Sequence, residues 1–137
     1  MPKKIHVVGV GGIGISALAR YFLSEGASVS GSDAVASELT EELEREGAKI
    51  RIGHDEHNVP AGTELVIYSP AVRPSNQELK FARALKIKIQ SYPQALGALT
   101  RKYFTIAVSG SHGKSTTTSL LALILMRAGF DPTVIVG

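Results

Sequence analysis

Residues 4–22, with the sequence KIHVVGVGGIGISALARYF, decide the fold class. The apolar run that opens this stretch is typical of a strand buried on both faces, and the apolar spacing that follows predicts a helix over 13–24. At their junction, Gly9, Gly11 and Gly14 form the pattern G-x-G-x-x-G. After a strand and at the head of a helix, this pattern predicts a tight turn whose backbone amides bind a diphosphate.

The same alternation continues toward residue 100. The sequence predicts strands over 4–10, 27–33, 48–53, 64–69 and 86–90, and helices over 13–24, 36–47, 75–85 and from Pro93 onward. Strands that alternate with helices favour a parallel sheet covered by helices. We therefore predict an α/β fold, a Rossmann-like parallel sheet with helices on both faces, in a domain spanning residues 1–100.

A second unit is predicted after the boundary stretch LGALTRKY. It consists of a strand over 103–110, a glycine loop, a helix over 113–129 and a strand over 131–136. About 35 residues cannot bury a core of their own. Residues 101–137 are therefore expected to be the truncated start of a phosphate-binding domain, whose apolar helix is covered by the first domain or by a second copy in a homodimer.

Composition excludes several classes of protein. The chain has 137 residues, is 44% hydrophobic and 20% charged, and contains no cysteine, which excludes disulfides and thiolate metal sites. Residues 1–100 hold equal numbers of basic and acidic side chains, so the net charge of +3 belongs to residues 101–137. No basic stripe for nucleic acid and no apolar run for a membrane span is present. We expect a cytoplasmic protein.

The first glycine pattern predicts the first binding site. Gly9 permits the tight turn, Gly11 the approach of a diphosphate and Gly14 close packing, while Asp33 ends the second strand, where it can accept a bond from a ribose hydroxyl. A pyrophosphate joined to a ribose occurs in NAD, in FAD and in UDP-sugars, and these alternatives stay open. The predicted substrate-binding residues are Gly9, Gly11, Gly12, Ile13, Gly14, Ser32, Asp33, His54 and Ser69.

The stretch VSGSHGKSTTT, residues 108–118, predicts a second phosphate site. It has the short pattern G-x-x-G-K-S, with Val108 where a full Walker loop has glycine. Its amides can bind phosphate oxygens, Lys114 can neutralise phosphate charge, and Ser115 or Thr116 can offer a hydroxyl to Mg²⁺. The predicted ATP-binding residues are Gly110, Ser111, His112, Gly113, Lys114, Ser115 and Thr116.

Together these motifs identify a family resemblance. HVVGVGGIGISALA, SGSD, YSPAVRPSNQEL and AVSGSHGKSTTTSLLALILMRAGFDPTVIVG resemble, in this order, the N-terminal part of a Mur ligase, over essentially the whole chain. His112 is similar to the family member that adds L-alanine, since other members usually have asparagine there. Ser111 and Ser115 replace the usual threonines but keep the hydroxyl. Ser69 and Pro70 replace the usual pair of serines.

The resemblance implies an ATP-dependent ligase of bacterial peptidoglycan synthesis. Its substrates would be UDP-N-acetylmuramate, ATP and L-alanine, with Mg²⁺ as cofactor, an acyl phosphate as intermediate and Lys114 as the catalytic residue. The family's remaining catalytic groups lie in later domains, so we expect residues 1–137 to bind without catalysing. The alternatives are a ligase that attaches a murein tripeptide to the same UDP-sugar, an NAD-dependent oxidoreductase, or a nicotinamide-binding regulatory domain.

Overall fold

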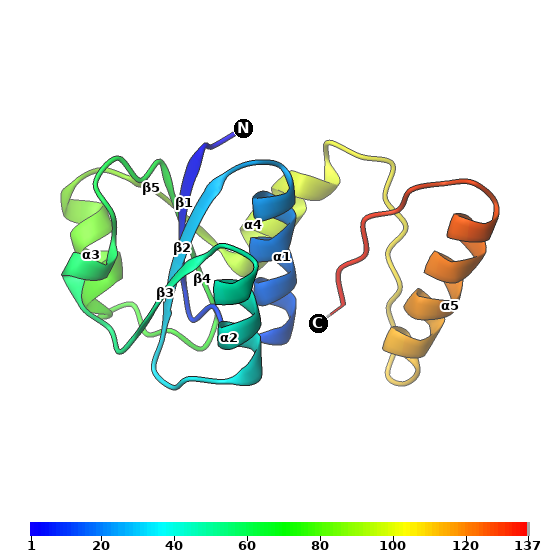
Figure 1. Cartoon of the computed structure of the whole chain (residues 1–137), viewed down its shortest axis with the longest axis horizontal. Helices are drawn as coiled ribbons and strands as arrows, with labels where there is room; N and C mark the ends of the chain where they lie inside the picture. Colours follow the sequence, from blue (N-terminus) through cyan, green and yellow to red (C-terminus); the bar gives the residue numbers. More distant parts are fainter. Residues whose placement is uncertain (137) are drawn as a thin grey trace.

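The computed structural model describes residues 1–136, whose main body is a five-stranded sheet with helices on both faces (Figure 1). All paired strands are parallel, and their order is β3-β2-β1-β4-β5. The strands are β1 (Lys4–Val8), β2 (Ser28–Asp33), β3 (Lys49–Ile52), β4 (Leu65–Tyr68) and β5 (Lys88–Ser91). The predicted α/β fold and its parallel sheet are confirmed.

Helices join these strands and cover the sheet. They are α1 (Ile13–Ser24), α2 (Glu38–Arg45), the short 3-10 helix η1 (Glu56–Asn58), α3 (Gln77–Ala84), α4 (Tyr92–Thr100) and, beyond the sheet, α5 (Lys114–Arg127). Figure 1 shows α1, α2 and α4 on one face and α3 on the other. The predicted helices are all present. The one helical element that was not predicted is η1, a single turn capped by the side chain of Asp55.

The core consists of two apolar clusters of different size, one on each face of the sheet. On the face of α1, α2 and α4, side chains such as Ile5, Leu18 and Leu43 are almost completely buried. On the face of α3 the apolar cluster is smaller and centres on Val66 and Leu79. Alternation along β1 explains this division, because successive side chains of a strand point to opposite faces. Beside this smaller cluster, the face of α3 also holds buried polar side chains, among them His6 and Glu78.

The second unit does not form the predicted sheet. Residues 103–110 and 131–136 run without regular secondary structure, so both of these predicted strands are wrong. An isolated extended segment is unstable because its backbone groups need a partner strand, and within residues 1–136 neither segment has one. The helix prediction is confirmed by α5, after whose end Gly129 takes a positive φ of 91°.

The first domain does not cover α5, contrary to one of the two arrangements expected. None of the helix's residues is buried, and Figure 1 shows it standing apart from the sheet. Contact with the first domain is confined to neighbouring segments: the hydroxyls of Tyr21 and Tyr103 lie 2.7 Å apart, and Ile135 packs against the larger core cluster. In the described range 1–136, no helix combines the length and apolar character that crossing a bilayer requires.

Candidate functional site

A cavity of about 570 Å³ opens at the carboxyl edge of the sheet. Open parallel sheets bind ligands at this edge, beside the strand where the order of connections reverses, which here is β1. The residues that line the cavity come from the carboxyl ends of four strands and the segments after them. The lining residues are Gly9, Gly11, Gly12, Asp33, Ala34, His54, Ser69, Ala71, Val72, Arg73, Ser75 and Asn76.

The structure therefore brings together six of the nine residues predicted to bind substrate. Gly9, Gly11 and Gly12 come from the first glycine loop. Asp33 is the last residue of β2, and His54 and Ser69 follow β3 and β4. These segments are distant in sequence, and the parallel register places their ends side by side. The other three residues, Ile13, Gly14 and Ser32, do not line the cavity.

Gly9 fixes the turn that begins the site. Its φ is 78°, and a Cβ added there would lie 2.8 Å from Cβ of Ser69. Its N–H donates to the carbonyl oxygen of Ser32 at 2.8 Å. Any other residue would meet both an unfavourable backbone conformation and the neighbouring loop. Gly9 thus holds the first glycine loop against the end of β2 and the segment that follows β4.

Asp33 has a partner within the protein. Its Oδ2 accepts a hydrogen bond of 2.8 Å from the N–H of Gly11, and a Cβ on Gly11 would lie 2.8 Å from the same oxygen. The side chain therefore braces the glycine loop as well as lining the cavity. Contact of Asp33 with a ribose hydroxyl stays a prediction. The carboxylate has further lone pairs, not used by the bond from Gly11, that could accept a hydrogen bond from that hydroxyl.

Helix α1 lacks the side-chain cap that its neighbours α2, α3 and α4 have. Ser37, Asn76 and Ser91 cap α2, α3 and α4 through their side-chain oxygens. The N-cap residues of α1 and α5 are Gly12 and Gly113, and neither makes a side-chain cap. A helix N-terminus without such a cap offers both its N–H groups and its dipole to a negative ligand.

Ile13 and Gly14 contribute backbone rather than side chains. Ile13 is exposed and is the first residue of α1. A Cβ on Gly14 would lie 2.5 Å from the hydroxyl oxygen of Tyr92, at the start of α4. The third glycine of the motif therefore permits the predicted close packing, which here is that of α1 against Tyr92.

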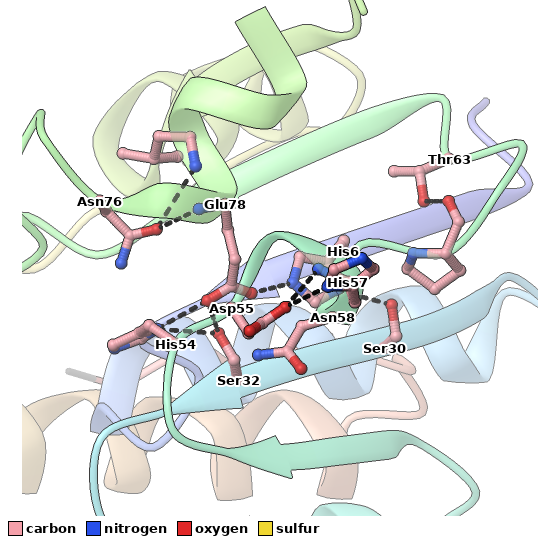
Figure 2. A network of polar contacts seen from close by, with 12 residues as sticks. His6, Ser30, Ser32, His54, Asp55, His57, Asn58, Thr63, Asn76 and Glu78 are labelled. Carbon is pink, nitrogen blue, oxygen red and sulfur yellow. Dashed lines mark hydrogen bonds and ion pairs between the residues drawn. The ribbon is translucent and has the colours of Figure 1, made fainter. Parts of the chain in front are cut away.

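Ser32 belongs to a buried polar network behind the cavity, which Figure 2 shows from close by. Its Oγ donates to Oε2 of Glu78 at 2.8 Å, and its side chain is buried. The Glu78 carboxylate also lies 2.6 Å from Nε2 of His6 and 2.7 Å from Nδ1 of His54. Ser32 is therefore buried behind the cavity and bonded to Glu78. Its contact with substrate stays a prediction.

The surroundings of Glu78 favour its ionised form in spite of complete burial. Burial by itself raises the pKa of a carboxyl group, but the hydrogen bonds from His6, His54 and Ser32 outweigh it and lower the pKa of Glu78 below its usual value. Ser30 extends the network, since its Oγ lies 2.8 Å from Nδ1 of His6. The network thus connects the core of the sheet to His54 at the cavity.

The second glycine loop contains two glycines with positive φ values and leads directly into α5. Gly110 and Gly113 have φ values of 148° and 73°, and Lys114 and Ser115 are the first residues of α5. The loop is exposed, and a Cβ on either glycine would meet nothing within 4 Å. The structure places the predicted ATP-binding residues together around the N-terminus of one helix; their contact with ATP stays a prediction.

Comparison with known proteins decides the family. The model of the Mur ligase family, catalytic domain, matches residues 4–104. The chain belongs to the Mur ligase family. It is 50% identical over 136 residues to the UDP-N-acetylmuramate--L-alanine ligase of Caldanaerobacter subterraneus subsp. tengcongensis, in a match that covers 98% of this chain and 29% of the relative.

Solved structures of Mur ligases share the arrangement. The UDP-N-acetylmuramate-alanine ligase of Thermotoga maritima matches with a TM-score of 0.86 and 36% identity over 92% of this chain and 30% of that one. The murein peptide ligase of Psychrobacter arcticus matches with a TM-score of 0.83 and 31% identity over 92% of this chain and 27% of that one. This Mur ligase chain thus spans about 30% of the length of the curated relatives it matches.

The sequence analysis missed several residues at the cavity of this Mur ligase. Arg73, Ser75 and Asn76 follow β4 in the stretch VRPSNQEL, where asparagine before a helical pattern predicts a helix cap. Their position after a predicted strand was a usable signal, because that edge binds ligands. His6 and Glu78 gave no such signal, since a lone glutamate in a helix is normally exposed.

Proposed function

We propose that this chain is the substrate-holding part of an ATP-dependent amide ligase that joins L-alanine to UDP-N-acetylmuramate in peptidoglycan synthesis. The first domain would hold the UDP part of the sugar nucleotide at the cavity. The second glycine loop would hold the phosphates of ATP. The reaction would pass through an acyl phosphate formed on the substrate carboxylate and release ADP and phosphate, with the amine of alanine forming the new amide bond.

The observation that best supports the proposal is the pair of glycine loops, each followed by a helix without a side-chain cap. A nicotinamide-binding oxidoreductase or regulatory domain would use the loop before α1 and has no need of Lys114 in a second loop. A ligase that activates a nucleotide-linked carboxylate with ATP uses both. The names of the relatives, which join UDP-N-acetylmuramate to alanine, support a ligase over a nicotinamide-binding protein.

The exposed Lys114 side chain at the start of α5 would offset the phosphate charge that otherwise keeps a carboxylate away from a triphosphate. The hydroxyls of Ser115 and Thr116 would hold Mg²⁺, whose preferred ligands are oxygen atoms. When bound, Mg²⁺ supplies further charge neutralisation. Within residues 1–136 no group of three His, Cys, Asp or Glu side chains is placed to hold a metal, so the donor set offered here is hydroxyl and phosphate oxygen.

A ligase that adds a murein peptide to the same UDP-sugar is the second candidate. Its support is the TM-score of 0.83 to the Psychrobacter arcticus structure, close to the 0.86 of the alanine ligase. Sequence identity favours alanine, at 36% against 31%. His112 in the second loop favours alanine as well, by the resemblance described above.

Calorimetric titration of the chain tests the proposal. We expect saturable heat with UDP-N-acetylmuramate and none with NADH under the same conditions, because the cavity would recognise a sugar nucleotide. ATP with Mg²⁺ should bind independently at the second loop. Saturable binding of NADH without binding of the UDP-sugar would overturn the proposal and favour a nicotinamide-binding protein.

A further inference from the structure

His54 stands between the cavity and the buried network. It follows β3, lines the cavity, and has a side chain that is 27% exposed. Its Nδ1 is engaged on the protein side, 2.7 Å from Oε2 of Glu78 and 3.3 Å from Oγ of Ser32. Within residues 1–136 its other ring nitrogen, Nε2, takes part in no hydrogen bond. Figure 2 shows the ring held at its Nδ1 side by Glu78.

Glu78 determines which nitrogen of His54 carries the proton. An ionised carboxylate has only acceptor sites, so each group that bonds to it must donate. The Oγ of Ser32 and Nε2 of His6 therefore donate to Glu78, and so does Nδ1 of His54. In a neutral imidazole with its proton on Nδ1, Nε2 presents a lone pair.

We propose that Glu78 is a positioning residue that holds His54 as the Nδ1–H tautomer, so that Nε2 accepts a hydrogen bond from the nucleoside of the ligand. This inference rests on the proposed function, since it assigns a role within the same cavity. Phosphate oxygens at neutral pH only accept hydrogen bonds, so a neutral Nε2 gains nothing from them. It selects an O–H or N–H donor, which in uridine is a ribose hydroxyl or the N3–H of the base.

The division of labour across the cavity agrees with this assignment. The N-terminus of α1 attracts a negative ligand, and the basic residue Arg73 is among those that line the cavity. These groups suit the diphosphate. His54 then binds the nucleoside, which the charged groups do not contact, and Glu78 fixes the orientation of the His54 ring.

The first test is the protonation pattern of His54 in the unaltered chain, measured by nitrogen-15 NMR at pH 8. We expect a protonated Nδ1 and an unprotonated Nε2. A proton on Nε2 would overturn the inference without any mutant. This measurement also keeps the inference testable if the variants below do not fold.

Two variants separate positioning from general support. Glu78→Gln replaces an acceptor of three bonds by an amide that can accept through one atom only, so we expect the His54 tautomer to change and UDP-N-acetylmuramate binding to weaken about tenfold. Ser30→Ala alters the same network on the side of His6. It should leave the His54 tautomer unchanged and the affinity for UDP-N-acetylmuramate within about twofold of the unaltered chain. Equal effects of the two variants would mean that Glu78 acts only structurally.

Ligand analogues identify the donor. We expect either 3-methyl-UDP, which lacks the imide N–H, or 2′-deoxy-UDP, which lacks a ribose hydroxyl, to bind about tenfold more weakly than UDP. That penalty should disappear in His54→Ala. Failure of the unaltered chain to bind UDP-N-acetylmuramate would overturn the proposed function, whereas binding unchanged by Glu78→Gln and His54→Ala would overturn only this inference.

Discussion

The two glycine-loop units of this chain share the predicted pattern of strand, loop and helix but differ in how much of the helix is buried. In the first, a strand, a glycine loop and helix α1 are enclosed by four further strands, and seven of the helix's residues are buried. In the second, the loop and α5 have no sheet beneath them within residues 1–136, and none of the helix's residues is buried. The comparison shows that local pattern suffices for a helix and its loop, while a strand requires a partner.

The largest effect should come from the same substitution made in both units. Leu43→Ala in α2 removes a side chain that is 0% exposed, and we expect the free energy of unfolding to fall by about 4 kcal/mol. Leu120→Ala in α5 shortens a side chain that is 56% exposed, and should change the free energy of unfolding by less than about 0.5 kcal/mol. Urea unfolding followed by circular dichroism measures both. Similar losses would show that α5 is packed in solution.

Glycine substitutions sharpen the comparison at the loops. Gly9→Ala combines a left-handed backbone with overpacking against Ser69, so we expect a loss of about 3 kcal/mol in thermal unfolding. Gly113→Ala has the same backbone conformation and open space around it, and should cost about 1 kcal/mol. A Gly113 variant as damaging as the Gly9 variant would indicate that the second loop is enclosed by contacts absent from this structure.

Binding should separate the two units as cleanly as folding does. We expect Lys114→Ala to weaken ATP binding at least tenfold, since it removes the positive charge beside the phosphates, and to leave UDP-N-acetylmuramate binding unchanged. Gly11→Val should do the reverse, because its side chain would meet Asp33 at the first loop. Paired calorimetric titrations measure both ligands. Loss of both ligands in either variant would mean that the two sites are not independent.

The smallest effect should come from the hydroxyl pair that joins the units. Tyr103→Phe removes the 2.7 Å hydrogen bond to Tyr21 and should cost about 0.5 kcal/mol. Burial and the neighbouring Tyr103 raise the pKa of Tyr21 to about 12 from 10.0. Because the folded state favours the neutral form of Tyr21, the raised pKa stabilises the fold below pH 10. This stabilisation is lost as the pH rises toward 12. Unfolding measured from pH 8 to 12 should therefore show a steeper loss for the unaltered chain than for Tyr103→Phe, and parallel curves would contradict this.

Much of the fold could be predicted because its signals are local. The period of the apolar residues indicated α1 and β1, and Gly9, Gly11 and Gly14 indicated the turn between them. Positions after the strands indicated His54 and Ser69, since parallel strands end at one edge. The two strands of the second unit were predicted by the same local reasoning and failed, because pairing is not a local property.

The amino-acid sequence by itself determined the order of strands and helices in residues 1–100, the two glycine loops and the family resemblance, since each depends on residues that are near neighbours in the chain. Only the tertiary structure decided that Asp33 binds the amide of Gly11, that Ser32 is buried, and that Glu78 joins His6 to His54. These pairs are separated by 22 residues or more. The hydrogen bonds that set a buried side chain's role depend on which surfaces the folded sheet and helices bring together.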